Sequence, residues 1–518
     1  MQTLKVKYVM KKFVCLMLVL SGFFCLSASA QTEALALYYK ACGQASRGQV
    51  DSAFMSLADC VGRMDGSYSR RYYSSFVTAP QLRVLHGDRR WEQLREELRH
   101  KKHLFEDEHI RQVPYPRKAS GVGAGQASGW HYDLEVDIDV AARTVAVKGW
   151  LDIGAGEGRV SMVLWRDSRI NTVAVDGKDV GYMLDTAAKS PVPYIRDGSP
   201  LYVDMPPGGG RLWLDYVCVM GERDGWEQSF GDDWIELGYY AAWYPVPVEG
   251  VPHNSTAQIA VTIDDGYRVG GSGFVTEDEG VWRMSQSWGS FDNVITASPR
   301  LNTLTCGRGD SKAVIDYIDF PDAAADSALQ VCGRIFDHYI RVCGQGGGYM
   351  KFLISSSEGV GGYSRKNYVS MMATSCDERL SVDMARQIGA LWWNKAPSDS
   401  WHDWLNVSFA EFMTLCYIRD TLGDGVYADY VDAYREDTRR ACPVWEVDRS
   451  SSKAYAVMHK KGALMLCDLD AEIGGKRTME FVGEVCRAGI TSTGQFLDFT
   501  HERLGRQWRT WFEKRLKE

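Results

Sequence analysis

The side chains of this sequence that could do chemistry gather in its last third. Cys376 precedes a pair of acids, and His402, Glu411 and His459 follow within the next hundred residues or so. A Cys–His pair could act as a nucleophile with its base, and two His with a Glu could hold a metal ion. Their spacing supports neither arrangement, and an isolated His is more often a structural residue than a ligand. The residue types therefore permit a catalytic or metal site here, but their spacing does not support one.

A spaced set of aromatic residues in the same region is more informative. Residues 383–412 read DMARQIGALWWNKAPSDSWHDWLNVSFAEF. This segment resembles the signature of the M1 family of zinc aminopeptidases, of the gluzincin type, H-E-x-x-H-x-W-W…W-L-N-E-G-F-A-E-Y. In that family two His one helical turn apart and a later Glu hold zinc, and the first Glu is the general base. The alignment is fixed by Trp392 and Trp393, by Trp404, Leu405 and Asn406, and by Phe409, Ala410, Glu411 and Phe412.

When these anchors fix the alignment, the family's zinc-ligand positions carry other residues. The first His falls on Arg386, the second on Ala390, and the Glu of W-L-N-E on Val407. The general base falls on Gln387, which cannot take a proton from water. Arg cannot be deprotonated in a protein, so a fixed positive charge occupies a ligand position. The loop between the two halves is also shorter than the family's. The resemblance thus implies a pseudoenzyme that binds no zinc and no other cofactor.

Two further segments agree with the resemblance. SSSEGVGGYSRKNYVSM, at 355–371, resembles the family's G-A-M-E-N strand, which binds the amino terminus of the substrate. With Gly361, Gly362 and Tyr363 as anchors, Ser364 stands where that Glu belongs. MHKKGALMLCDLDAEIG resembles the family's Y-x-K-G-A-x-x-L helix, and His459 replaces the Tyr that would stabilise the tetrahedral intermediate.

The emptied ligand positions lead to one structural expectation. Arg386 should aim its side chain into the cleft, as the first His would. Loss of a divalent cation leaves surplus acceptors, and a guanidinium offers five donors. Glu411 is one helical turn beyond Val407, on the same face. We therefore expect Arg386 to pair with Glu411, and we take Tyr363, Arg386 and Glu411 as candidate binding residues. The alternative is that Arg386 turns out to solvent.

The elements that carry these residues follow from the period of the apolar positions. Residues 31–119 have helical spacing, and Gly48, Ala53 and Leu57 resemble the middle of a tetratricopeptide repeat. This helical region is interpreted either as a partner-binding module or as a cap on the next domain. A Gly/Ser-rich linker follows at 120–129.

A change of period marks the next part of the chain. Leu134, Val136 and Ile138 alternate with acids, as a strand with one buried face would, and similar short strands recur across 130–318. This indicates a β-sandwich-type domain, like the N-terminal domain of the aminopeptidases. Helical spacing returns in 319–518, where the resemblance implies a thermolysin-like, α-rich domain. The predicted fold class is multidomain α+β.

The first thirty residues predict export. Four lysines precede an apolar run, and Ala28-Ser29-Ala30 is a small-residue cleavage site, so 1–30 is predicted to be a cleavable signal peptide. We expect the mature chain in the periplasm, on the cell surface or in the medium, with no transmembrane segment. The net charge is −8, and loss of the four lysines makes it −12, which argues against a nucleic-acid partner.

Thirteen cysteines fall to eleven after cleavage at this site. Most lie in apolar patterns typical of buried free thiols. Cys42 and Cys60 could pair across two helices, but the sequence does not decide it.

Three functions remain in play. The first is a non-catalytic peptide- or protein-binding scaffold. The second is a metallo-aminopeptidase or other hydrolase with a relocated active site. The third is a structural exported protein acting through its N-terminal helices.

Overall fold

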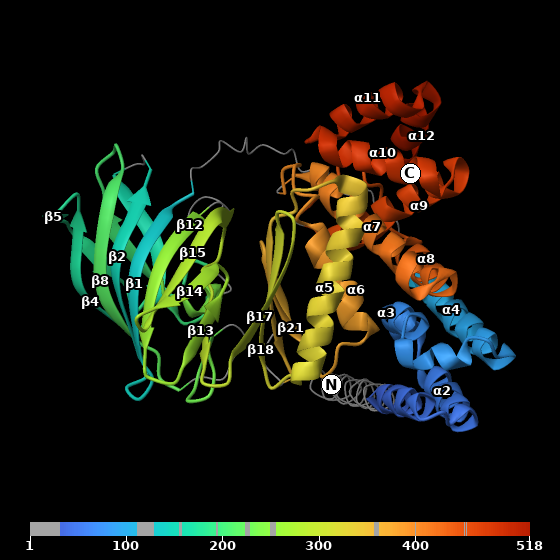
Figure 1. Ribbon diagram of the computed structural model, residues 1–518, viewed down its shortest axis with the longest axis horizontal. Helices are drawn as coiled ribbons and strands as arrows, with labels where there is room; N and C mark the ends of the chain where they lie inside the picture. The colour runs from blue at the N-terminus through green and yellow to red at the C-terminus, as the bar shows by residue number, and fades with distance from the viewer. Residues whose placement is uncertain are drawn as a thin grey trace, which may run out of the picture. The chain divides into compact units, whose positions relative to one another are not determined.

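A computed structural model describes residues 32–110, 129–154, 158–192, 195–222, 228–248, 255–356, 362–398, 400–449, 451 and 453–518 (Figure 1). The predicted signal peptide, almost all of the predicted linker and Gly361 lie outside these residues. The chain divides into two compact units. The helical unit consists of the described residues of Met1–Lys118, Val342–Gly344 and Trp392–Glu518, and the sheet unit of those of Ala119–Arg341 and Gln345–Leu391. Each unit is described by itself.

The largest part of the sheet unit is an eight-stranded sheet in the order β14-β15-β12-β1-β2-β8-β4-β5. Its strands are β1 (His131–Asp139), β2 (Thr144–Ile153), β4 (Ser168–Val175), β5 (Lys178–Asp179), β8 (Gly210–Val219), β12 (Ser255–Ile263), β14 (Phe274–Asp278) and β15 (Val281–Ser290). Along β1, Leu134, Val136 and Ile138 are buried while the acids between them are exposed. The predicted period of two is confirmed there.

Two smaller sheets complete the sandwich-type part of this unit. Their orders are β11-β3-β7-β6 and β13-β16-β10-β9. Their strands are β3 (Arg159–Trp165), β6 (Tyr182–Leu184), β7 (Gly198–Asp204), β9 (Gln228–Phe230), β10 (Ile235–Leu237), β11 (Val246–Pro247), β13 (Arg268–Gly271) and β16 (Ile295–Ser298), with a 3-10 turn, η2, at Tyr239–Ala241. Val147, Leu164 and Ile295, one from each of the three sheets, share one hydrophobic core with Trp243, which lies between η2 and β11. The sheets therefore enclose a common apolar layer, as a sandwich requires.

The rest of the sheet unit is a five-stranded sheet, β17-β18-β19-β21-β20, with two helices. The elements are β17 (Asn302–Arg308), β18 (Ser311–Ile318), α5 (Asp322–Cys343), β19 (Tyr349–Ser355), β20 (Tyr363–Arg365), β21 (Tyr368–Met372) and α6 (Glu378–Gly389). β18 and β19 are parallel, and α5 is the crossover that joins them. β20 pairs antiparallel with β21 and, among the described residues, forms one edge of the sheet.

The helical unit contains helices from both ends of the chain. After a helix at residues 32–46 come α2 (Val50–Arg63), α3 (Gly66–Val77), η1 (Pro80–Leu85), α4 (Arg89–His109), η4 (Trp401–Asp403), α7 (Trp404–Leu422), α8 (Asp424–Thr438), the π-helix η5 (Ala456–Lys461), α9 (Gly462–Ile473), α10 (Gly475–Ala488), α11 (Thr493–Leu504) and α12 (Arg506–Lys517). In the described part of the chain, no helix is apolar over enough of its length to span a bilayer. The fold is therefore multidomain α+β, as the sequence predicts.

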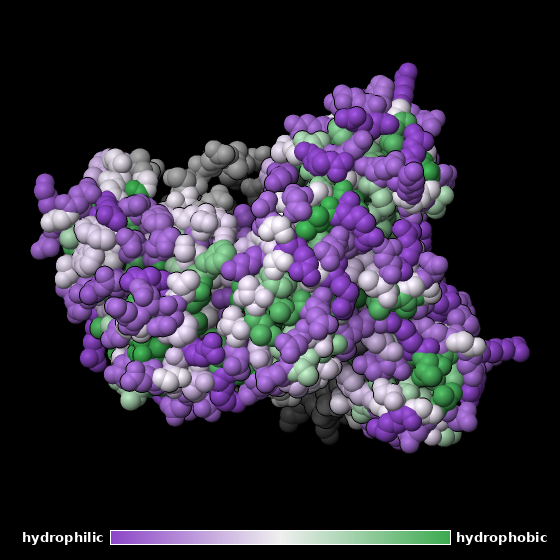
Figure 2. All heavy atoms as spheres, viewed as in Figure 1, coloured by the Kyte–Doolittle hydropathy of each residue, from purple (hydrophilic) through white to green (hydrophobic). Residues whose placement is uncertain are grey.

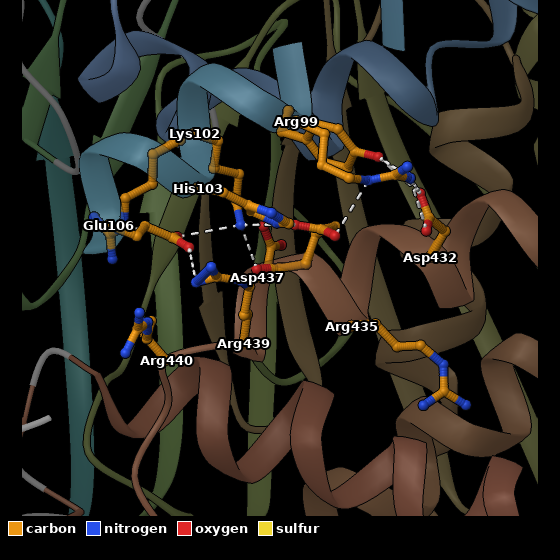
Figure 3. Close-up of polar contacts among 12 residues, drawn as sticks. Arg99, Lys102, His103, Glu106, Asp432, Arg435, Asp437, Arg439 and Arg440 are labelled. Atoms are coloured by element: carbon orange, nitrogen blue, oxygen red, sulfur yellow. Dashed lines mark hydrogen bonds and ion pairs between the residues drawn. The ribbon is translucent and has the colours of Figure 1, made fainter. Parts of the chain in front are cut away.

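The N-terminal helices are fastened to α8 by a dense set of polar contacts, drawn in Figure 3. Arg99 of α4 lies 3.0 Å from Asp432, and Lys102 lies 3.0 Å from Glu436. The Lys102 side chain is only 1% exposed, and His103 also reaches Glu436, at 2.7 Å. The helices therefore pack against α8 of the C-terminal part, and both interpretations, a partner-binding module and a cap on the next domain, stay predictions. The tetratricopeptide resemblance stays a prediction.

Candidate functional site

Two of the positions at which the family holds its zinc and its general base lie on helix α6, and a third directly follows its end. The helix begins at Asp377, whose carboxylate accepts a hydrogen bond from the Leu380 amide at 2.9 Å and caps the first turn. It ends at Gly389, so Arg386 and Gln387 lie on its last turn and Ala390 is the exposed residue that follows. Arg386 donates a hydrogen bond to Asp383, one turn back, at 2.7 Å. Within this unit, its charge is therefore partly balanced on its own helix.

The edge strand β20 brings Ser364 to this helix. Ser364 is exposed, and its hydroxyl donates to Gln387 Oε1 at 3.2 Å. The residue at the expected amino-terminus-binding position thus contacts the residue at the expected general-base position. Both are neutral, and neither can act as a base near pH 7. The sequence alignment placed them in one site, and in the structure they are neighbours.

The residues on either side of Ser364 point into the sheet unit instead. Tyr363 is 6% exposed, and its hydroxyl donates to Glu236 Oε1 at 2.7 Å. Arg365 donates to Asp292 at 2.6 Å, with both side chains almost fully buried. Tyr363 therefore packs into the interior of the unit, although the sequence suggested it as a binding residue, and Ser364 is the residue of β20 that faces out.

This buried group of acids escaped sequence reasoning. Burial raises the pKa of Glu236 to about 7, although the Tyr363 hydroxyl, the Trp234 indole and the Arg365 charge all favour its ionised form. Burial likewise raises the pKa of Asp292, against the opposing effect of Arg365. Glu236 lies on a three-residue strand and no motif surrounds it, so the only available signal was an acid between two apolar residues.

The remaining family positions lie in the helical unit. Val407 is half-buried on the first turn of α7, and Glu411, one turn on, is 1% exposed. The Tyr434 hydroxyl donates a hydrogen bond to Glu411 Oε1. His459 Nδ1 lies 4.0 Å from the other oxygen, and its ring stacks on Tyr455. Glu411 is thus engaged within this unit. Because Arg386 belongs to the sheet unit, its pairing with Glu411 stays a prediction.

The aromatic and small residues that define the alignment serve packing. Trp393 stacks on Phe409 with ring centres 4.6 Å apart. The Asn406 amide both donates to and accepts from the backbone of Ala396, at 2.9 and 3.1 Å, and so closes the loop before α7. A Cβ on Gly462 would lie 1.9 Å from Ser408 Oγ, so only glycine lets the start of α9 approach α7 this closely. The motif residues that this sequence retains therefore have a packing role.

The isolated residues considered for a relocated site have structural roles. His402 Nδ1 lies 3.0 Å from the Thr493 hydroxyl, and burial lowers its pKa. Asp377, next to Cys376, caps α6, and burial raises the pKa of the Cys376 thiol. Within the described ranges, no three His, Cys, Asp or Glu side chains gather closely enough to hold a metal ion.

Comparison with solved structures identifies proteins whose fold is similar to that of this chain. One match is a mutant of the M1 zinc metallopeptidase from Deinococcus radiodurans bound to a Tyr-Ser-Ala substrate, with a TM-score of 0.52 and 16% identity, covering 76% of this chain and 94% of that one. Another is yeast LTA4 hydrolase in complex with bestatin, with a TM-score of 0.52 and 14% identity, covering 80% and 70% of the two chains. No protein-family model matches the sequence, and no curated protein does.

The chain therefore has the fold of the M1 zinc metallopeptidases, as the resemblance implied. At these identities the likeness concerns the fold alone. The residues at the aligned ligand positions do not fit zinc: a guanidinium has no free lone pair, and the side chains of Ala390 and Val407 carry no nitrogen, oxygen or sulfur.

Proposed function

We propose that this protein is an exported, non-catalytic member of the M1-fold group that binds an extended peptide or a protein segment. One observation carries the proposal. The positions expected to hold zinc and its base are Arg386, Gln387, Ala390 and Val407, whereas the packing residues around them are kept. A fold preserved after the loss of its reactive groups is consistent with a retained binding role.

Two further points support a peptide as the ligand. The Deinococcus enzyme is a protein of this fold bound to a tripeptide. In the sheet unit, β20 is an edge strand in the described part of the sheet, and its middle residue, Ser364, is exposed beside Gln387. An edge strand can bind an extended peptide through its backbone, with a small polar side chain causing little obstruction.

The first experiment measures metal and activity. Purified protein should contain no stoichiometric zinc and should leave aminoacyl reporter substrates uncut. A variant with Arg386→His, Gln387→Glu and Ala390→His restores the two His ligands and the base within the sheet unit, and it should bind zinc more tightly than the unmodified protein. Chelator-sensitive cleavage by the unmodified protein would instead establish the hydrolase with a relocated site.

The second experiment measures binding. Fluorescently labelled Tyr-Ser-Ala is titrated with the protein, and the peptide is then recovered to check that it is intact. Ser364→Trp should weaken binding about tenfold by covering the β20 edge. Thr276→Trp is the matched control, because Thr276 is also exposed on an edge strand, β14 of the eight-stranded sheet. Equal affinities of the two variants would argue against β20 as the binding edge.

The N-terminal helices need a separate test. Figure 2 shows a largely hydrophilic surface with small hydrophobic areas, one of them over these helices. On these helices, Tyr39 and Met55 are each 69% exposed. Deleting the helices would remove Lys102 from Glu436, so lost stability and lost partner binding could not be told apart. Tyr39→Glu and Met55→Glu change only the surface, and loss of partner capture with these variants alone would favour the third function.

A further inference from the structure

Two pairs of cysteine side chains meet at helix α5, each pair within one unit. Cys332, in the middle of α5, is fully buried and hydrogen-bonds with Cys306 of β17. Cys343, the last residue of α5, is 3% exposed and hydrogen-bonds with Cys486 of α10. Each pair therefore joins a buried thiol to a half-exposed one.

The backbone geometry explains why the first pair meets. Arg308 lies two residues after Cys306 on β17, and so on the same face of the strand. Its guanidinium lies 3.2 Å from the position of a Cβ on Gly333 and 3.5 Å from Asp337. Gly333 directly follows Cys332. The face of β17 that carries Cys306 and the part of α5 that carries Cys332 are therefore in contact next to the two thiols.

The second pair meets where α10 touches the end of α5. A Cβ on Gly483 would lie 2.3 Å from the Val342 carbonyl oxygen, so the two backbones are in direct contact. Arg487 donates a hydrogen bond to the same carbonyl at 3.0 Å. Cys486 lies between these residues on that face of α10, and Cys343 directly follows Val342. The helix contact itself holds the two thiols together.

The two thiols of each pair also differ in how easily they ionise. The hydrogen bond from Cys332 and the Arg308 charge lower the pKa of the Cys306 thiol. The hydrogen bond from Cys343, with the Lys395 and Arg487 charges, lowers the pKa of Cys486. Burial and the hydrogen bond that it donates raise the pKa of Cys332, and the donated hydrogen bond and burial raise the pKa of Cys343. A reachable thiol that ionises easily, next to a second thiol, is the arrangement that thiol–disulfide exchange requires.

We propose that Cys306 with Cys332, and Cys343 with Cys486, are sites of disulfide formation that lock α5 to its neighbours. The oxidant is a disulfide compound, either oxidised glutathione or a protein disulfide. The half-exposed thiolate attacks one sulfur of that disulfide, releases the first thiol and forms a mixed disulfide. The buried thiol then loses its proton and attacks the protein sulfur of the mixed disulfide, which releases the second thiol. Each pair thus loses two electrons and two protons to one molecule of oxidant.

Other neighbouring cysteines differ in a way that the test can use. Cys42 and Cys60 lie close enough to influence each other, but Cys42 hydrogen-bonds with Tyr38, and burial raises the pKa of both thiols. Neither is a half-exposed, easily ionised thiol, so this pair, left open by the sequence, is expected to remain reduced.

The test uses the mature full-length chain. The reduced protein is equilibrated with oxidised glutathione, quenched with acid, unfolded and alkylated, and its cross-linked peptides are identified by mass spectrometry. The eleven free cysteines of the described structure should fall to seven, with links between 306 and 332 and between 343 and 486. The oxidised protein should also unfold at a temperature higher by about 5 °C or more. Cys343→Ser should abolish only the second link, and Cys218→Ser should change neither.

Two results would overturn the proposal. One is eleven free thiols after equilibration with oxidised glutathione. The other is a set of links that joins other cysteines, such as Cys42 with Cys60. Because the links are identified in the unmodified chain, the test remains decisive even if a serine variant fails to fold.

Discussion

The Ser364 hydroxyl donates a hydrogen bond to Gln387 Oε1 at 3.2 Å and joins the edge strand β20 to the last turn of α6. In an active M1-type site, the expectation is a carboxylate at both positions. Two carboxylates this close without a cation would repel each other, and the pKa of one would rise. A hydroxyl and an amide satisfy each other without a cation. A neutral residue at both positions is therefore what the proposed absence of zinc would favour, because no cation is needed to hold the two groups together.

The free energy of unfolding should depend on pH in a way that follows from the titration of Glu236. Its pKa is about 7 in the folded chain and 4.5 when unperturbed. A raised folded-state pKa stabilises the protein fully below pH 4.5, and this contribution is lost as the pH rises through 7. Glu236→Gln stays neutral at every pH, so it should be more stable than the unmodified protein at pH 8, by up to about 3 kcal/mol, and similar to it at pH 4. Urea unfolding at both pH values measures the difference.

Asp292→Asn provides the contrast for this prediction. It leaves the buried Arg365 guanidinium without its charged partner, so it should destabilise the protein at pH 5 and at pH 8 alike, by roughly 3–5 kcal/mol. Parallel stability profiles for Glu236→Gln and the unmodified protein would show that Glu236 does not titrate in this range.

Close packing at the start of α9 predicts a cost for one added methyl group. Gly462→Ala would place Cβ 1.9 Å from Ser408 Oγ, which itself donates to the Met458 carbonyl. We expect a loss of about 1–3 kcal/mol in the free energy of unfolding, because either α9 or the serine must move. Gly425→Ala in α8 is the matched control, since no atom lies within 4 Å of its new Cβ and it should be neutral or slightly stabilising. Similar losses for both variants would mean that the helix backbone, and not Ser408, sets the cost.

The α6–β20 and α7–α9 packing shows what sequence reasoning could reach. Tryptophans at fixed spacing and a glycine in K-K-G-A constrain how helices pack, so they revealed the M1 fold. The Gly-Gly-Tyr anchor separately identified Ser364, which lies beside Gln387. The alternation of β1 was visible for the same reason: one face of the sheet is buried. The Glu236–Asp292–Arg365 group was not visible, because its members lie on β10, on the connection before β16 and on β20, and meet only in the tertiary structure.

The N-terminal helices illustrate the same limit. Their apolar stripe predicted helices, but Lys102 looked like one more surface charge in a basic segment. Its burial depends on Glu436, more than 300 residues later, and no local pattern encodes that contact. Periodicity therefore predicts elements and buried faces, whereas a buried ion pair between distant segments becomes evident only once the tertiary structure is known.

Removing the Lys102 charge should destabilise the helical unit strongly. Lys102 lies 3.2 Å from Glu106 and 3.0 Å from Glu436, and its side chain is 1% exposed. Lys102→Met keeps much of the volume and leaves two carboxylates without their buried cation, which should cost roughly 3–5 kcal/mol. Adding Glu436→Gln should recover part of the loss. The neighbouring Lys101→Met serves as control, because that side chain is more exposed and should cost about 1 kcal/mol or less. Equal effects of the two substitutions in thermal unfolding would contradict a buried role for Lys102.

The last prediction concerns Glu411, whose carboxylate is buried in α7. Within the helical unit it accepts a hydrogen bond from Tyr434 and lies near His459, while Arg386, in the sheet unit, is held by Asp383. A buried carboxylate depends strongly on each donor, since an unmade hydrogen bond leaves charge without solvation. Tyr434→Phe and Glu411→Ala should therefore be coupled by about 1.5 kcal/mol in a double-mutant cycle of unfolding free energies.

The same cycle with Arg386→Ala tests the predicted pair. A coupling of about 1 kcal/mol or more between Arg386→Ala and Glu411→Ala would support the predicted pair. A coupling below about 0.3 kcal/mol, with the Tyr434 coupling intact, would show that Arg386 and Glu411 do not form the predicted pair. Arg386 would then be a residue whose charge is balanced within its own unit, as by Asp383, and Glu411 would depend on groups of the helical unit such as Tyr434.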